Sequence, residues 1–195
     1  VQNHIMQLVS LVAMEKPASF SADDVRNEKV KVLEAIRPVC ENSCCCSVVT
    51  GQYAAGSLNG KDIVGYRQSP GVSPDSNTET FVAFKMFVDT PTMKDVPIYI
   101  RTGKALATKN TEICLFFKPI ENPIFQKECS CNSSMNSLIL RIQPNDGVSV
   151  NFFTHKTGLL CLEARELSFY YPDFCPSPIP SAYEKLLHDA LLGDQ

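Results

Sequence analysis

Two lysines beside a glycine are the residues of this chain best suited to binding an anion. Lys104 and Lys109 stand five residues apart, just beyond a strand-like apolar run that ends at Gly103. Ammonium groups attract phosphate oxygens, and a glycine lets the backbone adopt conformations that a side chain would resist. The spacing also fits an ordinary charged loop at a sheet edge, because most lysines are exposed. Spacing alone leaves both interpretations open.

A histidine near the start of the chain is the second candidate for chemistry. His4 lies in the first turn of an apolar segment, with Leu8 and Leu11 predicted on the same helical face. Imidazole exchanges protons near neutral pH, which suits a general base. The alternative is a histidine packed in the core and hydrogen-bonded to a carbonyl, and the sequence does not decide between the two.

Nine cysteines raise the question of a disulfide framework or a metal site. Their odd number and a run of three in succession argue against disulfides and indicate a reducing compartment. Thiolates for zinc could come from five of them, but no pair of C-x2-C motifs is present; these are Cys40, Cys44, Cys46, Cys129 and Cys131. We therefore expect no metal site.

The overall composition excludes several classes of protein. There are 18 basic and 21 acidic residues, giving a net charge of −3, so no nucleic-acid partner is expected. No apolar run reaches the roughly 18 residues of a membrane span, and no leader sequence is recognisable. We expect a cytoplasmic protein without a membrane partner. The chain starts without a methionine inside a predicted helix, which suggests that it is incomplete.

The elements that must position these side chains are predicted as helices followed by antiparallel strands. Helices are expected at residues 1–14, from 21 to the Arg37-Pro38 stop, and at 182–192 before Gly193. Strands are expected at residues 78–89, 96–101, 112–118, 138–143 and 148–153, with Asn145-Asp146-Gly147 as a hairpin turn. The short connections predict an α+β fold with a large, mainly antiparallel sheet flanked by helices.

The start of the second helix carries two local signals. Ser21 and Asp24 have the spacing of a capping box, and Phe20 and Val25 have that of a hydrophobic staple. The dinucleotide-binding motif G-x-G-x-x-G, the P-loop, G-x-S-x-G and H-E-x-x-H are all absent from the sequence.

Several segments, in order along the whole chain, resemble the glucose-6-phosphate dehydrogenase family. They are Gln2-Asn3-His4, residues 25–33, Gly51-Gln52-Tyr53, Gly65-Tyr66-Arg67, residues 78–83, residues 96–104, residues 141–144 and residues 182–187. In that family a nucleotide-binding domain precedes a large, mainly antiparallel α+β domain. The resemblance implies that residues 1–195 form a single C-terminal domain, incomplete at both ends and lacking the N-terminal nucleotide-binding domain.

The resemblance also implies an activity. Members oxidise glucose 6-phosphate with NADP⁺ to 6-phosphogluconolactone, the first step of the oxidative pentose phosphate pathway, and assemble as homodimers or homotetramers through the sheet. The family's general base falls on His4, and its substrate-binding lysines fall on Lys104 and Lys109. The family's nucleotide loop and its D-H-Y-L-G-K motif have no counterpart here, so we expect the isolated chain to be inactive.

Departures from the family pattern leave two questions open. Arg101 and Arg141 match arginines that line a structural NADP⁺ site in some members, whereas Asn110 and Cys114 stand where those members carry basic residues. Met93 and Asp95 replace a tryptophan-glycine pair of the family. These replacements motivate the alternative that the chain is a non-catalytic binding or scaffold module that keeps the fold.

Overall fold

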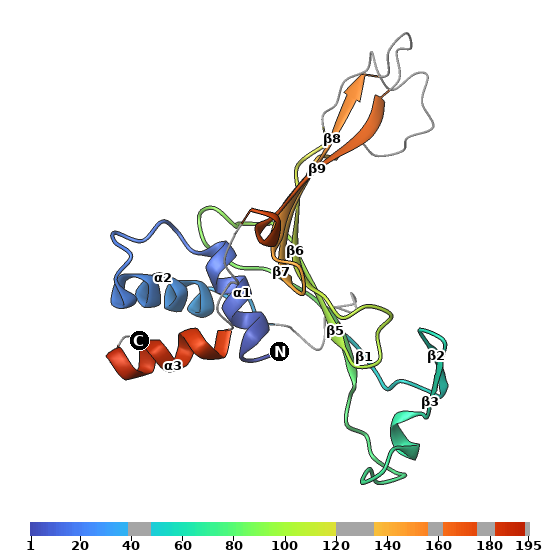
Figure 1. Cartoon of the computed structure of the whole chain (residues 1–195). Coiled ribbons are helices and arrows are strands. Elements are labelled where there is room, and N and C mark those ends of the chain that lie inside the picture. The colour runs from blue at the N-terminus through green and yellow to red at the C-terminus, as the bar shows by residue number, and fades with distance from the viewer. Residues whose placement is uncertain (39–47, 120–134, 156–161, 175–181, 194–195) are drawn as a thin grey trace. The chain divides into compact units, whose positions relative to one another are not determined.

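The computed structural model describes residues 1–38, 48–119, 135–155, 162–174 and 182–193. The chain divides into two compact units, Val1–Ala107 and Thr108–Gln195. The first unit holds two helices and two small sheets, and the second holds a four-stranded sheet and one helix (Figure 1).

The two N-terminal helices lie side by side. Helix α1 spans His4–Ala13 and helix α2 spans Ala22–Glu34. The predicted N-cap of α2 is confirmed, since the Ser21 hydroxyl accepts a hydrogen bond from the Asp24 backbone N–H at 3.2 Å. The predicted staple is wrong: Phe20 is 99% exposed, so its ring does not pack on α2.

A three-stranded antiparallel sheet forms the centre of the first unit. It comprises β1 (Val48–Gly51), β4 (Phe81–Met86) and β5 (Ile98–Gly103), in the order β1-β4-β5. Between β1 and β4 the chain leaves this sheet and forms the hairpin of β2 (Gly56–Leu58) and β3 (Lys61–Ile63). The hairpin was not predicted, because strands of three residues are too short to show a hydrophobic period.

One hydrophobic core joins the helices to the sheet. Its buried members are Val9 and Ala13 of α1, Val32 of α2, and Met86 and Val88 of the β4 region. Two residues of β5, at positions 98 and 100, pack against this cluster. The helix that begins at His4 and the strand that leads to Lys104 are therefore held by the same core.

An ion pair fastens the end of α2 to the segment after β4. The Arg37 guanidinium donates two hydrogen bonds to the Asp89 carboxylate, and its second acidic neighbour, Asp95, lies at 3.5 Å. Backbone hydrogen bonds from Arg37 to Phe87 at 3.0 Å and from Asp89 to Ala35 at 2.8 Å reinforce the junction. The hydrogen bonds from Arg37 lower the pKa of Asp89 below its usual value, and the charges of Arg37 and Lys94 act in the same direction.

We expect Asp89→Asn to lower the urea-unfolding midpoint at pH 6 and to matter less in acid. Because the pKa of Asp89 is lower in the folded state, its stabilising contribution is fully present above the ordinary aspartate value of about 3.9 and is lost as pH falls further. The midpoints of wild type and variant should therefore converge below about pH 4. Asp75→Asn, at an exposed position outside this pair, is the control; a difference that stays constant down to low pH would contradict the assignment.

The second unit is built on one antiparallel sheet in the order β6-β7-β8-β9. Its strands are β6 (Thr111–Phe116), β7 (Ser137–Gln143), β8 (Gly147–His155) and β9 (Leu162–Tyr170), of which β8 and β9 form a long ribbon (Figure 1). The pairing of β7 with β8 confirms the predicted hairpin. Strand β9 was not predicted.

Helix α3 has the predicted bounds, Ala182–Leu192, and Gly193 ends it with a φ of 72°. The α+β class with antiparallel strands is confirmed, although the described strands are divided among three sheets. The five cysteines considered for zinc lie outside the described residues. Among the residues that are described, no group of His, Cys, Asp or Glu side chains could hold a metal ion. Within the described part, no helix has both the length and the apolar character needed to cross a membrane.

Candidate functional site

Lys104 stands at the point where strand β5 leaves the sheet. The register pairs Gly103 with Phe81, and the Lys104 N–H continues the ladder by donating to the Thr80 carbonyl at 2.8 Å. The next residue, Ala105, has a φ of 52°, a conformation that costs a residue with a Cβ roughly 1–2 kcal/mol. The backbone is thus fixed on one side of Lys104 and turned sharply on the other, while the lysine itself is exposed.

Gly103 is needed for a different reason from the one predicted. It is an extended residue of β5 and is not among the glycines with positive φ. A Cβ at this position would lie 2.8 Å from a ring carbon of Phe81 and 3.2 Å from the Thr80 carbonyl oxygen. The glycine therefore permits a close approach of β5 to the start of β4, which brings Lys104 to its place beside Thr80.

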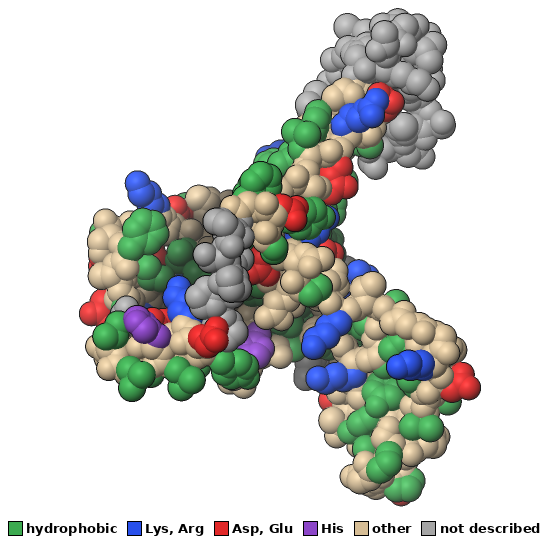
Figure 2. Space-filling view, viewed as in Figure 1, with side chains coloured by type: hydrophobic (Ala, Val, Ile, Leu, Met, Phe, Trp, Pro, Cys, Tyr) green, Lys and Arg blue, Asp and Glu red, His purple; other side chains and the backbone are tan. Residues whose placement is uncertain are grey.

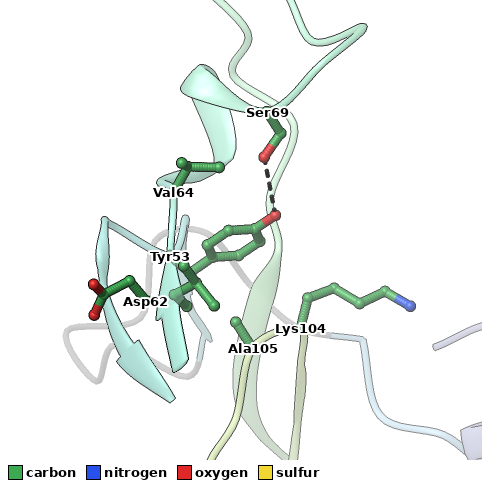
Figure 3. A pocket seen from close by; sticks show the side chains of 7 residues that line it. Tyr53, Asp62, Val64, Ser69, Lys104 and Ala105 are labelled. Atoms are coloured by element: carbon green, nitrogen blue, oxygen red, sulfur yellow. Dashed lines mark hydrogen bonds between the residues drawn. The ribbon is translucent and has the colours of Figure 1, made fainter. Parts of the chain in front are cut away.

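An open pocket of about 410 Å³ lies next to Lys104 (Figure 3). It is lined by Tyr53, Asp62, Ile63, Val64, Ser69, Lys104 and Ala105. The Tyr53 hydroxyl and the Ser69 hydroxyl are 3.5 Å apart. In Figure 3 the lysine side chain extends away from the tyrosine ring, and Lys104 is an exposed residue.

Lys109 belongs to the second unit, two residues before β6, and is exposed. The two lysines thus fall in different units of the chain. Lys109 follows Thr108, whose hydroxyl donates to the Asn110 side chain at 3.4 Å. This places Lys109 on a short segment directly before the four-stranded sheet.

His4 is the first residue of α1, and its side chain is exposed. The alternative of a histidine packed in the core is therefore wrong for this structure. The core contacts of α1 are made further along the helix, by Val9 and Ala13. An exposed imidazole at the start of a helix can reach a small molecule without rearrangement of the core.

His4 and Lys104 lie on elements that pack against the same hydrophobic core. Helix α1 packs in the cluster that also contacts Ile98 and Ile100 of β5. Lys104 lies four residues beyond Ile100, about 13 Å further along an extended chain. Both residues thus belong to one compact unit, Val1–Ala107, although no hydrogen bond between them is found among the described residues.

The two arginines that raised the question of a structural NADP⁺ site, Arg101 and Arg141, have different surroundings. Arg101 is an exposed residue of β5. Arg141 donates to the Ser149 hydroxyl, lies 3.5 Å from Glu166 and stands 5.5 Å from the centre of the Tyr170 ring. The Ser168 hydroxyl lowers the pKa of Glu166 by donating to it at 2.6 Å, and Ser149 and Arg141 add to this effect.

The face drawn in Figure 2 carries both basic and acidic side chains. On the face drawn in Figure 2, several basic side chains lie near one another on and beside the lower right lobe, with apolar side chains around them, and acidic side chains are scattered over the described surface.

Comparison with known proteins identifies relatives along the whole chain. The family model for the glucose-6-phosphate dehydrogenase C-terminal domain matches residues 1–195. Glucose-6-phosphate 1-dehydrogenase of Bacillus subtilis is 42% identical over 196 residues, covering 100% of this chain and 40% of the relative. The same enzyme of Chlamydia pneumoniae is 41% identical over 198 residues, covering 100% of this chain and 38% of the relative.

Solved structures agree with the sequence matches. A glucose-6-phosphate dehydrogenase in complex with its substrate glucose-6-phosphate superposes with a TM-score of 0.79 at 34% identity, over 99% of this chain and 38% of that one. Glucose-6-phosphate 1-dehydrogenase from Mycobacterium avium gives a TM-score of 0.77 at 30% identity, over 100% of this chain and 38% of that one. The chain therefore spans about two fifths of the length of these relatives.

Proposed function

The chain belongs to the glucose-6-phosphate dehydrogenase family, as its C-terminal domain, and we propose that it binds glucose 6-phosphate for an NADP-dependent dehydrogenase. One observation carries this proposal. The exposed residues His4 and Lys104, which the family's motifs assign to proton removal and phosphate binding, lie on a helix and a strand that share one core.

In the proposed reaction the C1 hydroxyl of the sugar phosphate loses its proton and C1 loses a hydride, which gives the lactone. His4 accepts the hydroxyl proton, while Lys104 and Lys109 hold the phosphate through charge-assisted hydrogen bonds. Because these bonds act at the end of the sugar remote from C1, they orient the reacting carbon and support the chemistry through binding.

The hydride acceptor, NADP⁺, finds no ordinary dinucleotide site among the residues that the structure describes. Dinucleotide sites use a glycine-rich turn between a parallel strand and a helix. Every strand pair in the described part is antiparallel, and no such turn is present there. We infer that a separate nucleotide-binding domain holds the cofactor, and we assign no NADP⁺ contact to this chain.

The proposal includes a cytoplasmic enzyme that forms homodimers or homotetramers through its sheet. Exposed apolar side chains on the strands support an interface, among them Tyr99 at 74% and Leu167 at 65% exposure.

The replacements that motivated a non-catalytic module are accommodated by the fold. Met93 packs against the core cluster. Asp95 adopts a φ of 61°, which aspartate tolerates better than most residues, and pairs with Arg37. Neither replacement contacts His4 or Lys104 through any hydrogen bond of the described residues, so both are compatible with an active enzyme.

The proposal predicts that NADPH forms only when a nucleotide-binding domain accompanies this chain. The full-length protein should produce NADPH from glucose 6-phosphate and NADP⁺, and the purified 195-residue chain should produce none. Absorbance of NADPH at matched molar concentrations measures both. If the full-length protein forms no NADPH, the non-catalytic module is favoured. If the 195-residue chain alone forms NADPH, this chain contains a nucleotide site that the proposal does not include.

A further inference from the structure

Two side chains close the base of the segment 52–79, which leaves the sheet after β1 and returns at β4. The Gln52 side-chain amide donates to the carbonyl oxygens of Ser76 and Thr78, both at 2.8 Å. The Arg67 Nε donates to Gln52 Oε1 at 2.9 Å and to the Ser76 carbonyl at 3.0 Å. Positions more than 20 residues apart in sequence are thereby joined.

The pairing of Gln52 with Arg67 is specific in its geometry. The amide directs both N–H groups toward carbonyls and its oxygen toward the guanidinium, so the opposite orientation would lose all three hydrogen bonds. A further nitrogen of Arg67 donates to the Asn77 side chain at 3.3 Å. The N–H donors of Arg67 are thus directed toward residues of the segment 52–79 itself, and they hold the two ends of this segment together. We name Gln52 and Arg67 the bracket.

Thr80 connects the bracket to Lys104. Its N–H donates to the Gly51 carbonyl at 2.9 Å, and its hydroxyl accepts from the Tyr53 N–H at 3.0 Å. Its carbonyl accepts the Lys104 N–H at 2.8 Å. Gln52 follows directly on Gly51, and the bracket ties it to the carbonyls of Ser76 and Thr78, in the segment that leads into Thr80. The backbone of Lys104 is therefore placed by a residue whose own position depends on the bracket.

We propose that Gln52 and Arg67 are positioning residues for Lys104, acting through Thr80. The inference rests on the proposed function in one respect, namely that Lys104 binds the substrate phosphate. A charge-assisted hydrogen bond weakens when its donor is displaced, so loosening the bracket should weaken phosphate binding without touching the reacting carbon. Arg67 then affects the substrate only by way of Lys104.

A double-variant experiment in the full-length protein tests this route. Arg67→Met should raise the KM for glucose 6-phosphate roughly 5- to 10-fold and leave kcat within about twofold, because binding rather than chemistry is altered. In a Lys104→Met background the same change should raise KM less than about twofold, because the group that it positions is already gone. Arg26→Met is the matched control and should leave KM unchanged, since among the described residues that exposed arginine of α2 pairs with Asp23 alone, at 2.9 Å.

Thr80 provides a second test that does not remove a charge. Thr80→Val keeps the size of the side chain but loses the acceptor for the Tyr53 N–H, and should raise KM as Arg67→Met does. Thr80→Ser keeps the hydroxyl and should restore the wild-type KM. The KM for NADP⁺ and the melting temperature separate local misplacement from loss of the fold.

The outcomes distinguish the two levels of the proposal. If Arg67→Met raises KM by the same factor with and without Lys104, Arg67 acts independently and the positioning role is overturned. If Lys104→Met alone leaves KM unchanged, the phosphate-binding role of Lys104 fails, and the positioning proposal fails with it.

Discussion

Replacing His4 by alanine in the full-length protein is expected to lower kcat by about 10²- to 10⁴-fold, the usual contribution of a general base. The KM for glucose 6-phosphate should change by less than about threefold, because the phosphate is held elsewhere. Steady-state NADPH formation at saturating substrate measures the first quantity, and its dependence on sugar phosphate measures the second.

The position of His4 explains why the loss should fall on turnover. The residue begins α1 and is exposed, whereas the contacts that stabilise the helix are made by Val9, Ser10 and Ala13. Removing the imidazole therefore opens no cavity in the core and should leave the melting temperature within about 1–2 °C of wild type. A loss of activity can then be attributed to chemistry rather than to unfolding.

Two further measurements separate a base from a structural residue. Added imidazole should partly restore the rate of the His4→Ala variant, because a small base can occupy the space of the missing side chain. His188→Ala is the matched control, since that exposed histidine of α3 lies beside Asp189 at 3.6 Å and has no proposed role. An unchanged kcat in His4→Ala would refute the assignment of the base.

Sequence patterns predicted the parts of the fold that depend on local chemistry. Helix α3 was predicted with its observed bounds, because a continuous helical pattern runs up to Gly193, whose φ of 72° ends it. The turn Asn145-Asp146-Gly147 likewise predicted the pairing of β7 and β8. Strand β9 was missed because its charged residues interrupt the apolar pattern, whereas nine backbone pairs with β8 define it.

The sequence predicted the functional side chains of the candidate site but not the tertiary contacts that position them. The lysine after Gly103 was found from its position beyond an apolar strand, but the reason for the glycine was not, since the close approach to Phe81 is a tertiary contact. The bracket of Gln52 and Arg67 was missed for the same reason. Its hydrogen bonds join residues 9 to 26 positions apart, and such contacts leave no periodic signal in the sequence.

Replacing the two lysines is expected to weaken the binding of glucose 6-phosphate strongly. Lys104→Ala should raise the KM for glucose 6-phosphate by roughly 10- to 100-fold, since hydrogen bonds to charged groups contribute about 1.5–3 kcal/mol. The effect on kcat should be smaller, with some loss where orientation of C1 depends on the held phosphate. Lys109→Ala should act in the same direction. Initial rates over a range of sugar-phosphate concentrations give both constants.

Lys61→Ala is the matched control, because that exposed lysine of β3 lies in the same unit and lines no part of the pocket beside Lys104. Its KM should equal that of wild type. If Lys61→Ala and Lys104→Ala weaken binding equally, the lysines act only through the overall charge of the protein. An unchanged KM in Lys104→Ala would instead remove this residue from the site.

Salt dependence provides a criterion that a merely structural role of Lys104 could not meet. Attraction between an exposed ammonium group and a phosphate dianion is screened by salt, with a Debye length of about 10 Å at 0.1 M and about 3 Å at 1 M. The KM of the wild type should therefore rise with ionic strength, and that of Lys104→Ala should rise less. Lys104→Arg keeps the charge but replaces a compact ammonium by a planar fork, so it should retain the salt dependence while recovering only part of the affinity. A variant that loses affinity but keeps the full salt dependence would show that Lys104 shapes the site without contacting the phosphate.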